Sequence, residues 1–387
     1  MAVTPVQSGN PGLMRSMNER AALALLIARG PMTRVRLGEA AGLSGPTTSQ
    51  LVKRLSEAGL VTEAGHTKGS RGPNAAIYRA CTESALGVAL HVRIAHIAAQ
   101  VVDAEDRAYP AVEMTPAADG HDAWATVADA IAAACDAAQC APGSIAAICV
   151  GGPGAVSADG DVLRYAEDMP GWPSRAVRSQ LEEQLGVSVL IENDANLAAV
   201  AEAHVRGDNK DFAFLWQGEG LGVAVMANGQ IYRGATGGAG EIGYLPAPRT
   251  AAGLDADASD MQGLAGSEAV TRVAQALQPS IETFDDALQA LREGELRIPM
   301  LAELAPRTAQ ALVPVIAMLD PDYIVLGGPT GSAFGLEGAG LVEAYLRHET
   351  RWCTPVVDAI ASNDPVLRGA AKRLSEYLAE RLLSRVV

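Results

Sequence analysis

The sequence has few aromatic side chains, no long apolar run and no paired cysteine motif. Aromatic residues make up 4% of the 387 residues, so small side chains dominate, which favours helices packed closely on sheets. No stretch of about 18 consecutive apolar residues occurs, which argues against a membrane-spanning helix. The first residues lack the charged start and apolar run of a signal peptide. We therefore expect a cytoplasmic protein that makes no membrane contact.

The cysteines are odd in number and show no CxxC spacing, which argues against a disulfide framework and against a cysteine-rich zinc site. We expect isolated buried thiols and no metal at these five positions: Cys81, Cys135, Cys140, Cys149 and Cys353.

The net charge of −15 hides a strong asymmetry along the chain. Residues 1–80 contain ten Lys or Arg and four Glu, a net charge of +6, whereas the remaining 307 residues carry a net charge of −21. Such a contrast is typical of a nucleic-acid-binding head on an acidic body. Because the body would repel DNA phosphates, DNA contact should be confined to the head.

Three helices followed by a two-stranded hairpin are predicted within residues 15–80. Apolar residues recur at helical spacing over 17–29, and Thr33 can cap a second helix over 34–41. Gly42 then supplies the tight turn that two helices crossing near a right angle require. This order is that of a winged helix-turn-helix.

The third predicted helix, over 45–58, begins after Ser44 as its N-cap and is the candidate recognition helix. Residues 59–79 form the hairpin, with a basic, glycine-rich tip. The side chains that we expect to contact DNA are Thr33, Arg34, Ser44, Thr47, Thr48, Ser49, Gln50, Lys53, Arg54, Lys68 and Arg71. The alternative is a three-helix dimerisation or docking module whose cations only solvate one face.

From residue 84 onward, strands and helices alternate, which predicts an α/β body. Its strands run into short motifs: Gly151-Gly-Pro-Gly154, Gly171-Trp172, Glu192-Asn-Asp-Ala-Asn196, Gly218-Glu-Gly-Leu-Gly222, Ala239-Gly-Glu-Ile-Gly243 and Leu326-Gly-Gly328. The order of these motifs strongly resembles the ROK family of repressors and sugar kinases, and the N-terminal winged helix resembles its repressor branch. The resemblance implies a two-lobed, actin-like ATPase fold with a ligand between the lobes.

The resemblance also implies the division of the chain. We expect a flexible tail over 1–14, the head over 15–80, a first lobe over 84–205 completed by 366–387, and a second lobe over 206–365.

Two departures from the family pattern predict that the body is not a kinase. ROK kinases carry an Asp-x-Gly-Gly-Thr-like turn, whereas residues 89–93 read Ala-Leu-His-Val-Arg and offer no acidic group for a metal. Glu219 replaces the threonine of the second phosphate loop, which should repel nucleotide. Asp194, which matches the general base, is kept. We therefore expect neither enzymatic activity nor a cofactor.

The zinc site of the family is also altered. Tyr244 stands at the position of its histidine, and residues 250–264 lack its cysteine cluster. We expect Asp255, Asp257 and Asp260 to lie in an exposed acidic loop and no metal to be bound.

Half of the polar positions that match sugar contacts in the family are kept and half are exchanged. The ligand residues implied are Gly154, Asp168, Asn193, Asp194, Glu241, Tyr244 and Gln262, of which Asp168, Tyr244 and Gln262 depart from the family pattern. The resemblance thus implies a sugar-like ligand other than glucose or its N-acetyl amine derivatives. The alternative is a vestigial pocket. Trp172 either stacks on a sugar or packs within the lobes.

We expect a homodimer, or a dimer of dimers, that binds double-stranded DNA at a pseudo-palindromic operator. A sugar-like ligand would change the spacing of the two heads. The rival hypotheses are an active sugar kinase that also binds DNA, and a DNA-binding protein that responds to no ligand.

Overall fold

The N-terminal head, residues 11–80, forms three helices and a small sheet in the order β1-β3-β2. The computed structural model describes residues 11–67, 74–93, 96–115, 123–157, 160–164, 172–361 and 364–386. The elements of the head are α1 (Pro11–Arg29), β1 (Met32–Thr33), α2 (Arg34–Ala41), α3 (Gly45–Glu57), β2 (Val61–His66) and β3 (Ala76–Ala80). Their order confirms the predicted winged helix-turn-helix.

Leucines from all three helices make the core of the head. Leu23, Leu26, Leu37, Leu51 and Leu55 are each at most 1% exposed. The first helix starts earlier than its apolar pattern predicted, because residues 11–14, expected in a flexible tail, form its first turn. A proline is well tolerated there, since the first helical N–H has no partner within the helix. Residues 1–10 of the expected tail lie outside the described residues.

The first half of the body contains a five-stranded sheet in the order β10-β7-β4-β5-β6. The strands β4 (Leu86–Val92), β7 (Ile145–Gly152) and β10 (Ser188–Asn193) are parallel, and β5 (Ile97–Asp103) and β6 (Ala108–Met114) extend the sheet beyond β4 through antiparallel pairs. Because the three parallel strands end at one edge, the glycine-rich motif after β7 lies beside the polar motif after β10.

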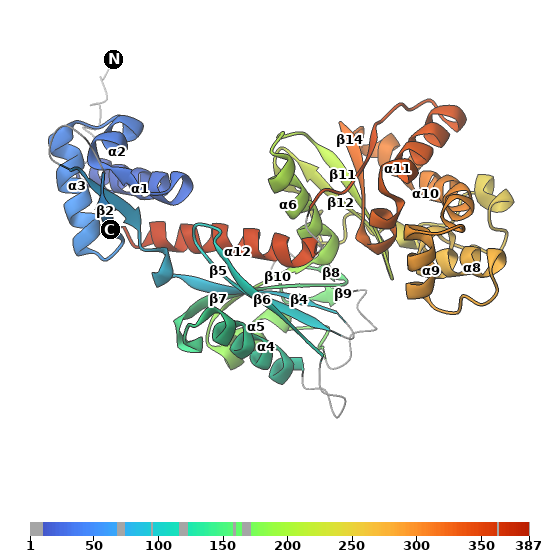
Figure 1. Cartoon of the computed structure of the whole chain (residues 1–387), viewed down its shortest axis with the longest axis horizontal. Coiled ribbons are helices and arrows are strands. Elements are labelled where there is room, and N and C mark those ends of the chain that lie inside the picture. Colours follow the sequence, from blue (N-terminus) through green and yellow to red (C-terminus); the bar gives the residue numbers. More distant parts are fainter. Residues whose placement is uncertain are drawn as a thin grey trace, which may run out of the picture.

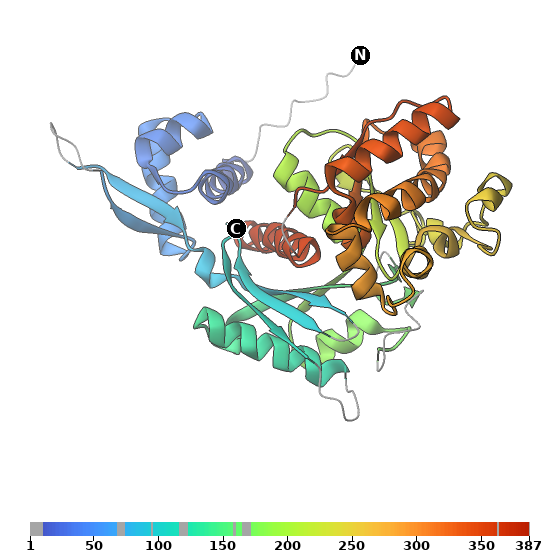
Figure 2. The ribbon, with the colours of Figure 1, turned by 45° about the vertical axis from the view of Figure 1, so that its right-hand side comes forward.

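Two helices cover the outer face of this first sheet, as Figure 2 shows below its strands. The helices and the short elements around them are η1 (Thr82–Ser84), α4 (Ala123–Ala138), η2 (Pro142–Ser144), β8 (Ala155–Val156), β9 (Leu163–Arg164) and α5 (Val177–Leu185).

The second half of the body repeats this plan with a sheet in the order β13-β12-β11-β14-β15. Its strands are β11 (Phe212–Gln217), β12 (Leu221–Ala227), β13 (Gln230–Ile231), β14 (Tyr323–Gly327) and β15 (Val356–Asp358). Its outer face is covered by helices, and the elements on that side are η3 (Ile242–Tyr244), η4 (Arg249–Gly253), α7 (Met261–Ala265), α8 (Ser267–Leu277), α9 (Phe284–Arg292), α10 (Arg297–Leu319) and α11 (Gly328–Glu349).

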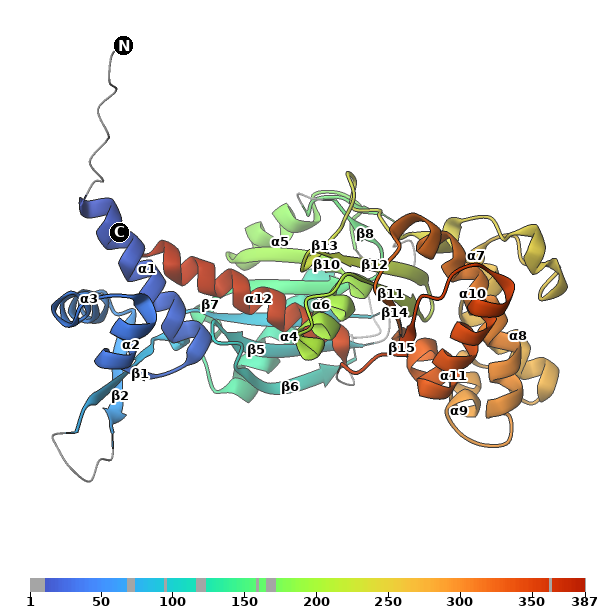
Figure 3. The same cartoon turned by 90° about the horizontal axis from the view of Figure 1, so that it is seen from above.

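Two helices, α6 (Asp194–Arg206) and α12 (Pro365–Ser384), lie between the sheets and form a shared middle layer. One apolar core runs from the head through α12 and α6 to the inner face of the second sheet. Figures 1 and 3 show α12 extending from this layer to the head. Arg20 of α1 reaches Glu380 of α12 at 3.5 Å. The two-lobed α/β fold is thereby confirmed. No helix in the described ranges is long and apolar enough to span a membrane.

Candidate functional site

Side-chain caps at the start of α2 and α3 hold the helix-turn-helix in shape. Thr33 caps α2, its Oγ1 accepting from the Arg36 N–H at 3.4 Å, and Gly42 ends that helix at φ 67°. Ser44 caps α3, its Oγ accepting from the Thr47 N–H at 3.4 Å. Both N-termini are therefore ordered, and their free N–H groups are suited to phosphate contact.

The outer face of α3 presents most of the residues that the sequence nominated. The side chains of Ser44, Thr47, Ser49, Gln50 and Lys53 are exposed. Lys53 forms an exposed ion pair with Glu57 of the same helix, at 3.8 Å, which leaves its cation available because such pairs are weak.

Arg34 lies at the edge of this surface, where its guanidinium is 5.9 Å from the ring centroid of Tyr78 on β3. The stacking restrains an exposed cation next to the wing, and it gives Tyr78 a role that sequence reasoning missed. Lys68 and Arg71, predicted at the tip of the wing, lie outside the described residues.

The expected DNA contact by Thr48 is wrong, because this side chain points inward. It is 1% exposed, and its Oγ1 donates to the Ser44 carbonyl at 3.0 Å. A Cβ on Gly38 of α2 would lie only 2.8 Å from that Oγ1, so Thr48 fills the α2–α3 contact. The sequence spacing could have predicted this inward direction, since Thr48 lies on the same helical face as the buried Leu51 and Leu55.

Arg54 of α3 forms an ion pair with a buried carboxylate of the head. Its Nε donates to Oε1 of Glu19 on α1 at 2.5 Å, and the Glu19 side chain is 8% exposed. Glu19 lies on the buried side of α1, four residues before Leu23. A buried carboxylate requires a partner, and Arg54 provides it. Arg54 therefore joins α3 to α1, a structural role that the sequence did not reveal, while its side chain remains 37% exposed.

In the body, the start of α6 brings several of the predicted ligand residues together. Asn193 caps α6 through its Oδ1, and its Nδ2 donates to the Gly154 carbonyl at 2.9 Å. Asp194, the next residue, accepts from the Ala195 N–H at 2.7 Å. Three predicted ligand residues from two strand ends thus meet at one edge of the first sheet.

The carboxyl group of Asp194 is perturbed by its surroundings. Burial raises its pKa from 3.8 to about 6, against the opposing effects of the Ala195 N–H and of His91, while Glu219 of the second lobe raises it further. Burial also raises the pKa of Glu241, and the charge of Asp194 adds to that rise. The charges of Asp194 and of two acidic groups from the second lobe, Glu219 and Glu241, therefore influence one another.

Close backbone packing places Glu241. At the preceding Gly240, φ is 94° and a Cβ would lie 1.7 Å from the Val223 carbonyl of β12, so only glycine fits this turn. Tyr244 is 61% exposed at the end of η3. Asp168 lies outside the described residues.

Gln262 has a different use from the ligand contact that we expected. Its Oε1 accepts from the Leu221 N–H at 2.7 Å, and its Nε2 donates to the Glu219 carbonyl at 2.6 Å. Both polar atoms of this amide are thus committed to the turn at 218–222. Gln262 supports the shape of that turn, and the expected direct contact with a ligand is not favoured by its geometry.

The position of the kinase phosphate turn is occupied by His91, which sequence reasoning did not select. His91, the residue before the last one of β4, is 7% exposed and donates from Nδ1 to Oδ1 of Asp364 at 2.8 Å. Asp364 also caps α12 by accepting from the Leu367 N–H at 2.9 Å. Burial opposes ionisation of Asp364, but the hydrogen bond and charge of His91, the Leu367 N–H and the charge of Arg93 together outweigh it and lower the pKa of Asp364. An imidazole and a carboxylate are thus hydrogen-bonded to each other between the end of β4 and the start of α12.

The expected exposed acidic loop is wrong for Asp255. Its side chain is 11% exposed and lies 2.8 Å from Arg307 and 3.0 Å from Arg272. Asp260 caps α7. In the described ranges no group of three His, Cys, Asp or Glu side chains is placed to hold a metal ion, and these residues do not fit the zinc site of the family.

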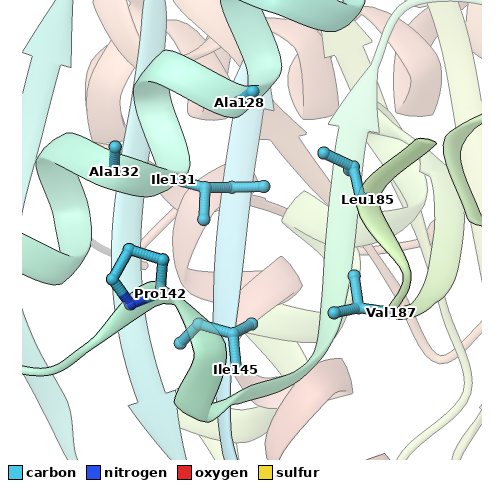
Figure 4. Close-up of a pocket in the computed structure, with 7 residues that line it drawn as sticks. All are labelled: Ala128, Ile131, Ala132, Pro142, Ile145, Leu185 and Val187. Carbon is cyan, nitrogen blue, oxygen red and sulfur yellow. The ribbon is translucent and has the colours of Figure 1, made fainter.

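Trp172 packs within the first lobe, where its ring centroid is 5.7 Å from that of Trp124 in an edge-to-face arrangement. An apolar pocket of about 170 Å³ opens on the same outer side of the first sheet, between α4 and the loop that enters β10. Figure 4 shows its lining: Ala128, Ile131, Ala132, Pro142, Ile145, Leu185 and Val187. It lacks a hydrogen-bonding side chain and lies across the sheet from Asp194, so we assign it no ligand.

The comparisons with known proteins divide the chain as its structure does. A model of the MarR family matches residues 16–72, and a model of the ROK family matches residues 88–376. The xylose repressor of Caldicellulosiruptor bescii is 24% identical over 84% of this chain and 86% of its own length.

Two solved structures share the fold. A ROK family transcriptional regulator described as a homologue of the E. coli MLC protein has a TM-score of 0.71, at 18% identity, over 96% of this chain and 99% of its own. The ROK hexokinase of Thermus thermophilus has a TM-score of 0.61, at 27% identity, over 76% of this chain and 99% of its own. The match includes almost all of the hexokinase but leaves about a quarter of this chain outside it, because this chain also has the N-terminal head. The chain belongs to the ROK family.

Proposed function

We propose that this protein is a sequence-specific transcription regulator, in the repressor manner of its relatives, whose DNA affinity depends on a sugar-like ligand. The observation that carries the proposal is the doubly capped helix-turn-helix with its exposed polar face on α3, joined by α12 to a sugar-kinase-like body. The positive head and negative body support the same assignment, because they restrict DNA to one end of the molecule.

The body acts without phosphoryl transfer in this proposal. His91 and its partner Asp364 stand where a phosphate loop would need small residues, and Glu219 places a negative charge at the second loop. Nucleotide phosphates would meet repulsion from Glu219, and in the described ranges no group of three His, Cys, Asp or Glu side chains is placed to hold a metal ion that would offset it.

The middle layer connects the polar groups around Asp194 with the head. Asp194 opens α6, Asp364 opens α12, and His91 interacts with both carboxylates. The far end of α12 buries Leu378 and Leu382 in the same core as the head. A ligand that rearranges the polar groups at the helix starts would shift α12 and thereby the two heads of a homodimer. Coupling of this kind requires that ligand affinity differ between free and operator-bound protein.

Selection of genomic fragments by the full-length protein at near-physiological salt tests the DNA-binding part. Enrichment of a few palindromic sites near sugar-uptake or glycosidase genes supports regulation and nominates ligands. Titration of those sugars with and without operator then tests the switch. Equal ligand affinities in the two titrations refute it, and fragments without a shared motif refute sequence-specific regulation.

One observation favours a second function, an active sugar kinase that also binds DNA. Asp194 occupies the position of the general base, and its pKa of about 6 lies near neutrality, where a base works efficiently. Sugar-dependent ATP turnover that Asp194→Asn abolishes would establish this alternative. Absence of turnover with the sugars that alter operator affinity would exclude it.

A further inference from the structure

The structure reduces the number of α3 residues that can contact DNA bases. The inference drawn from this rests on the proposed function. Base edges in the major groove are distinguished by hydrogen-bonding side chains, typically near the N-terminus of the recognition helix. Two of the residues nominated on α3 have partners within the head. Thr48 is 1% exposed against α2, whereas Arg54, whose side chain is 37% exposed, is bound through its Nε to the buried carboxylate of Glu19.

The first turn of α3 is committed to capping. The hydroxyls of Ser44 and Thr47 lie 2.8 Å apart and are hydrogen-bonded to each other, and Ser44 also accepts from the Thr47 N–H. Hydroxyls fixed at a helix N-terminus suit phosphate oxygens, which orient a protein on DNA and carry no direct sequence information.

Three of the nominated side chains beyond the first turn are exposed: Ser49, Gln50 and Lys53. Within the part of the chain that the structure describes, the side chains of Ser49 and Gln50 form no hydrogen bond with protein groups, whereas Lys53 has a distant ion pair with Glu57. A serine hydroxyl donates and accepts equally and discriminates poorly between bases. The lysine cation is a point charge on a flexible stem, and we assign it to a backbone phosphate.

We propose that Gln50 is the principal base-reading residue and that it reads an adenine in each half-site. Its amide presents one acceptor beside a donor, which matches the N6 donor and N7 acceptor of adenine. Guanine offers two acceptors at the corresponding edge. Cytosine and thymine each offer a single hydrogen-bonding group there, the N4 donor of cytosine and the O4 acceptor of thymine. Each half of the operator therefore contains one A·T pair whose identity is set by Gln50.

The test is selection from a randomised duplex library by the full-length protein and its variants, followed by affinity measurements on single-base changes. Gln50→Ala is expected to lose about 5- to 150-fold of discrimination at one base pair per half-site, symmetric about the operator centre. Gln50→Glu is expected to change the preference at that pair from adenine to cytosine, because a carboxylate only accepts. Gln50 is exposed, so both variants should keep the wild-type fold.

Two further variants serve as controls. Lys53→Ala should weaken binding to all sequences alike and reduce the salt slope by about one. Arg54→Met should lower the stability of the head and leave the selected motif unchanged. A wild-type motif in which every position survives Gln50→Ala, or in which Arg54→Met removes a position, overturns the assignment of Gln50 alone. A wild-type protein that selects no motif overturns the proposed function, and the assignment with it.

Discussion

The contact between α6 and α12 allows a sharp test, because it depends on one glycine. A Cβ on Gly369 of α12 would lie 1.9 Å from the carbonyl oxygen of Leu197 on α6, whereas Cβ atoms essentially never approach within 3.0 Å. The neighbouring atom belongs to the backbone and cannot rotate away. In the Gly369→Ala variant the two helices must therefore move apart by about 1 Å at the crossing.

The magnitude follows from two opposing effects. Forcing one extra carbon into a packed core costs about 1–3 kcal/mol, and the rigid carbonyl places this site near the upper end. Alanine in place of glycine in a helix interior stabilises the helix by about 1 kcal/mol. We expect Gly369→Ala to be less stable than the wild type by about 2 kcal/mol, measured as a lower urea midpoint and thermal midpoint.

Gly340 provides the matched control for this substitution. It lies within α11, is exposed, and has nothing within 4 Å of the position of a Cβ. Gly340→Ala should therefore be more stable than the wild type, by about 0.5–1 kcal/mol. The same change in two helices is thus expected to have opposite signs. A Gly369→Ala variant that matches Gly340→Ala in stability would refute the close crossing of α6 and α12.

Two further predictions concern buried carboxylates. Burial raises the pKa of Asp194 from 3.8 to about 6, so the folded state holds this proton more tightly than the unfolded chain, and ionised Asp194 lowers stability above pH 6. Asp194→Asn should therefore raise the thermal midpoint at about pH 7.5, with a difference that disappears towards about pH 4; a constant difference across the series would contradict this origin. Asp255→Asn leaves Arg307, which is 9% exposed, without its carboxylate and should cost about 3–5 kcal/mol in urea unfolding. Asp257→Asn, two residues away at an exposed position, should change stability by less than about 0.5 kcal/mol, and equal losses in the two variants would contradict the ion-pair explanation.

Local signals predicted the elements of the head closely. The second helix runs over 34–41 as its pattern indicated, and Thr33 and Ser44 cap the helices that they were expected to cap. These features depend on a few neighbouring residues, because a cap joins a side chain to an N–H only two or three positions later. The start of α1 was placed too late, because its first turn contains exposed residues and lacks a buried stripe.

Assignments that depended on the direction of a side chain were less secure. The sequence placed Thr48 among polar neighbours and suggested an outward direction, yet the helical period puts it on the buried side. Similarly, Gln262 has the chemistry of a sugar contact, but its amide supports the 218–222 turn. Residue type indicates which bonds a group can form and leaves the partner undetermined.

The sequence by itself determined the order of helices and strands, the charged head, the helix caps and the motifs that place the chain in its family. Only the tertiary structure decided that His91 meets Asp364, 273 residues away, that Glu19 holds Arg54, and that α12 lies against both α6 and the head. The physical reason is that periodicity shows which face of an element is apolar but not which distant element will cover it. Partners of buried polar groups are chosen by the folded arrangement as a whole, since each such group must find a hydrogen bond wherever packing leaves it.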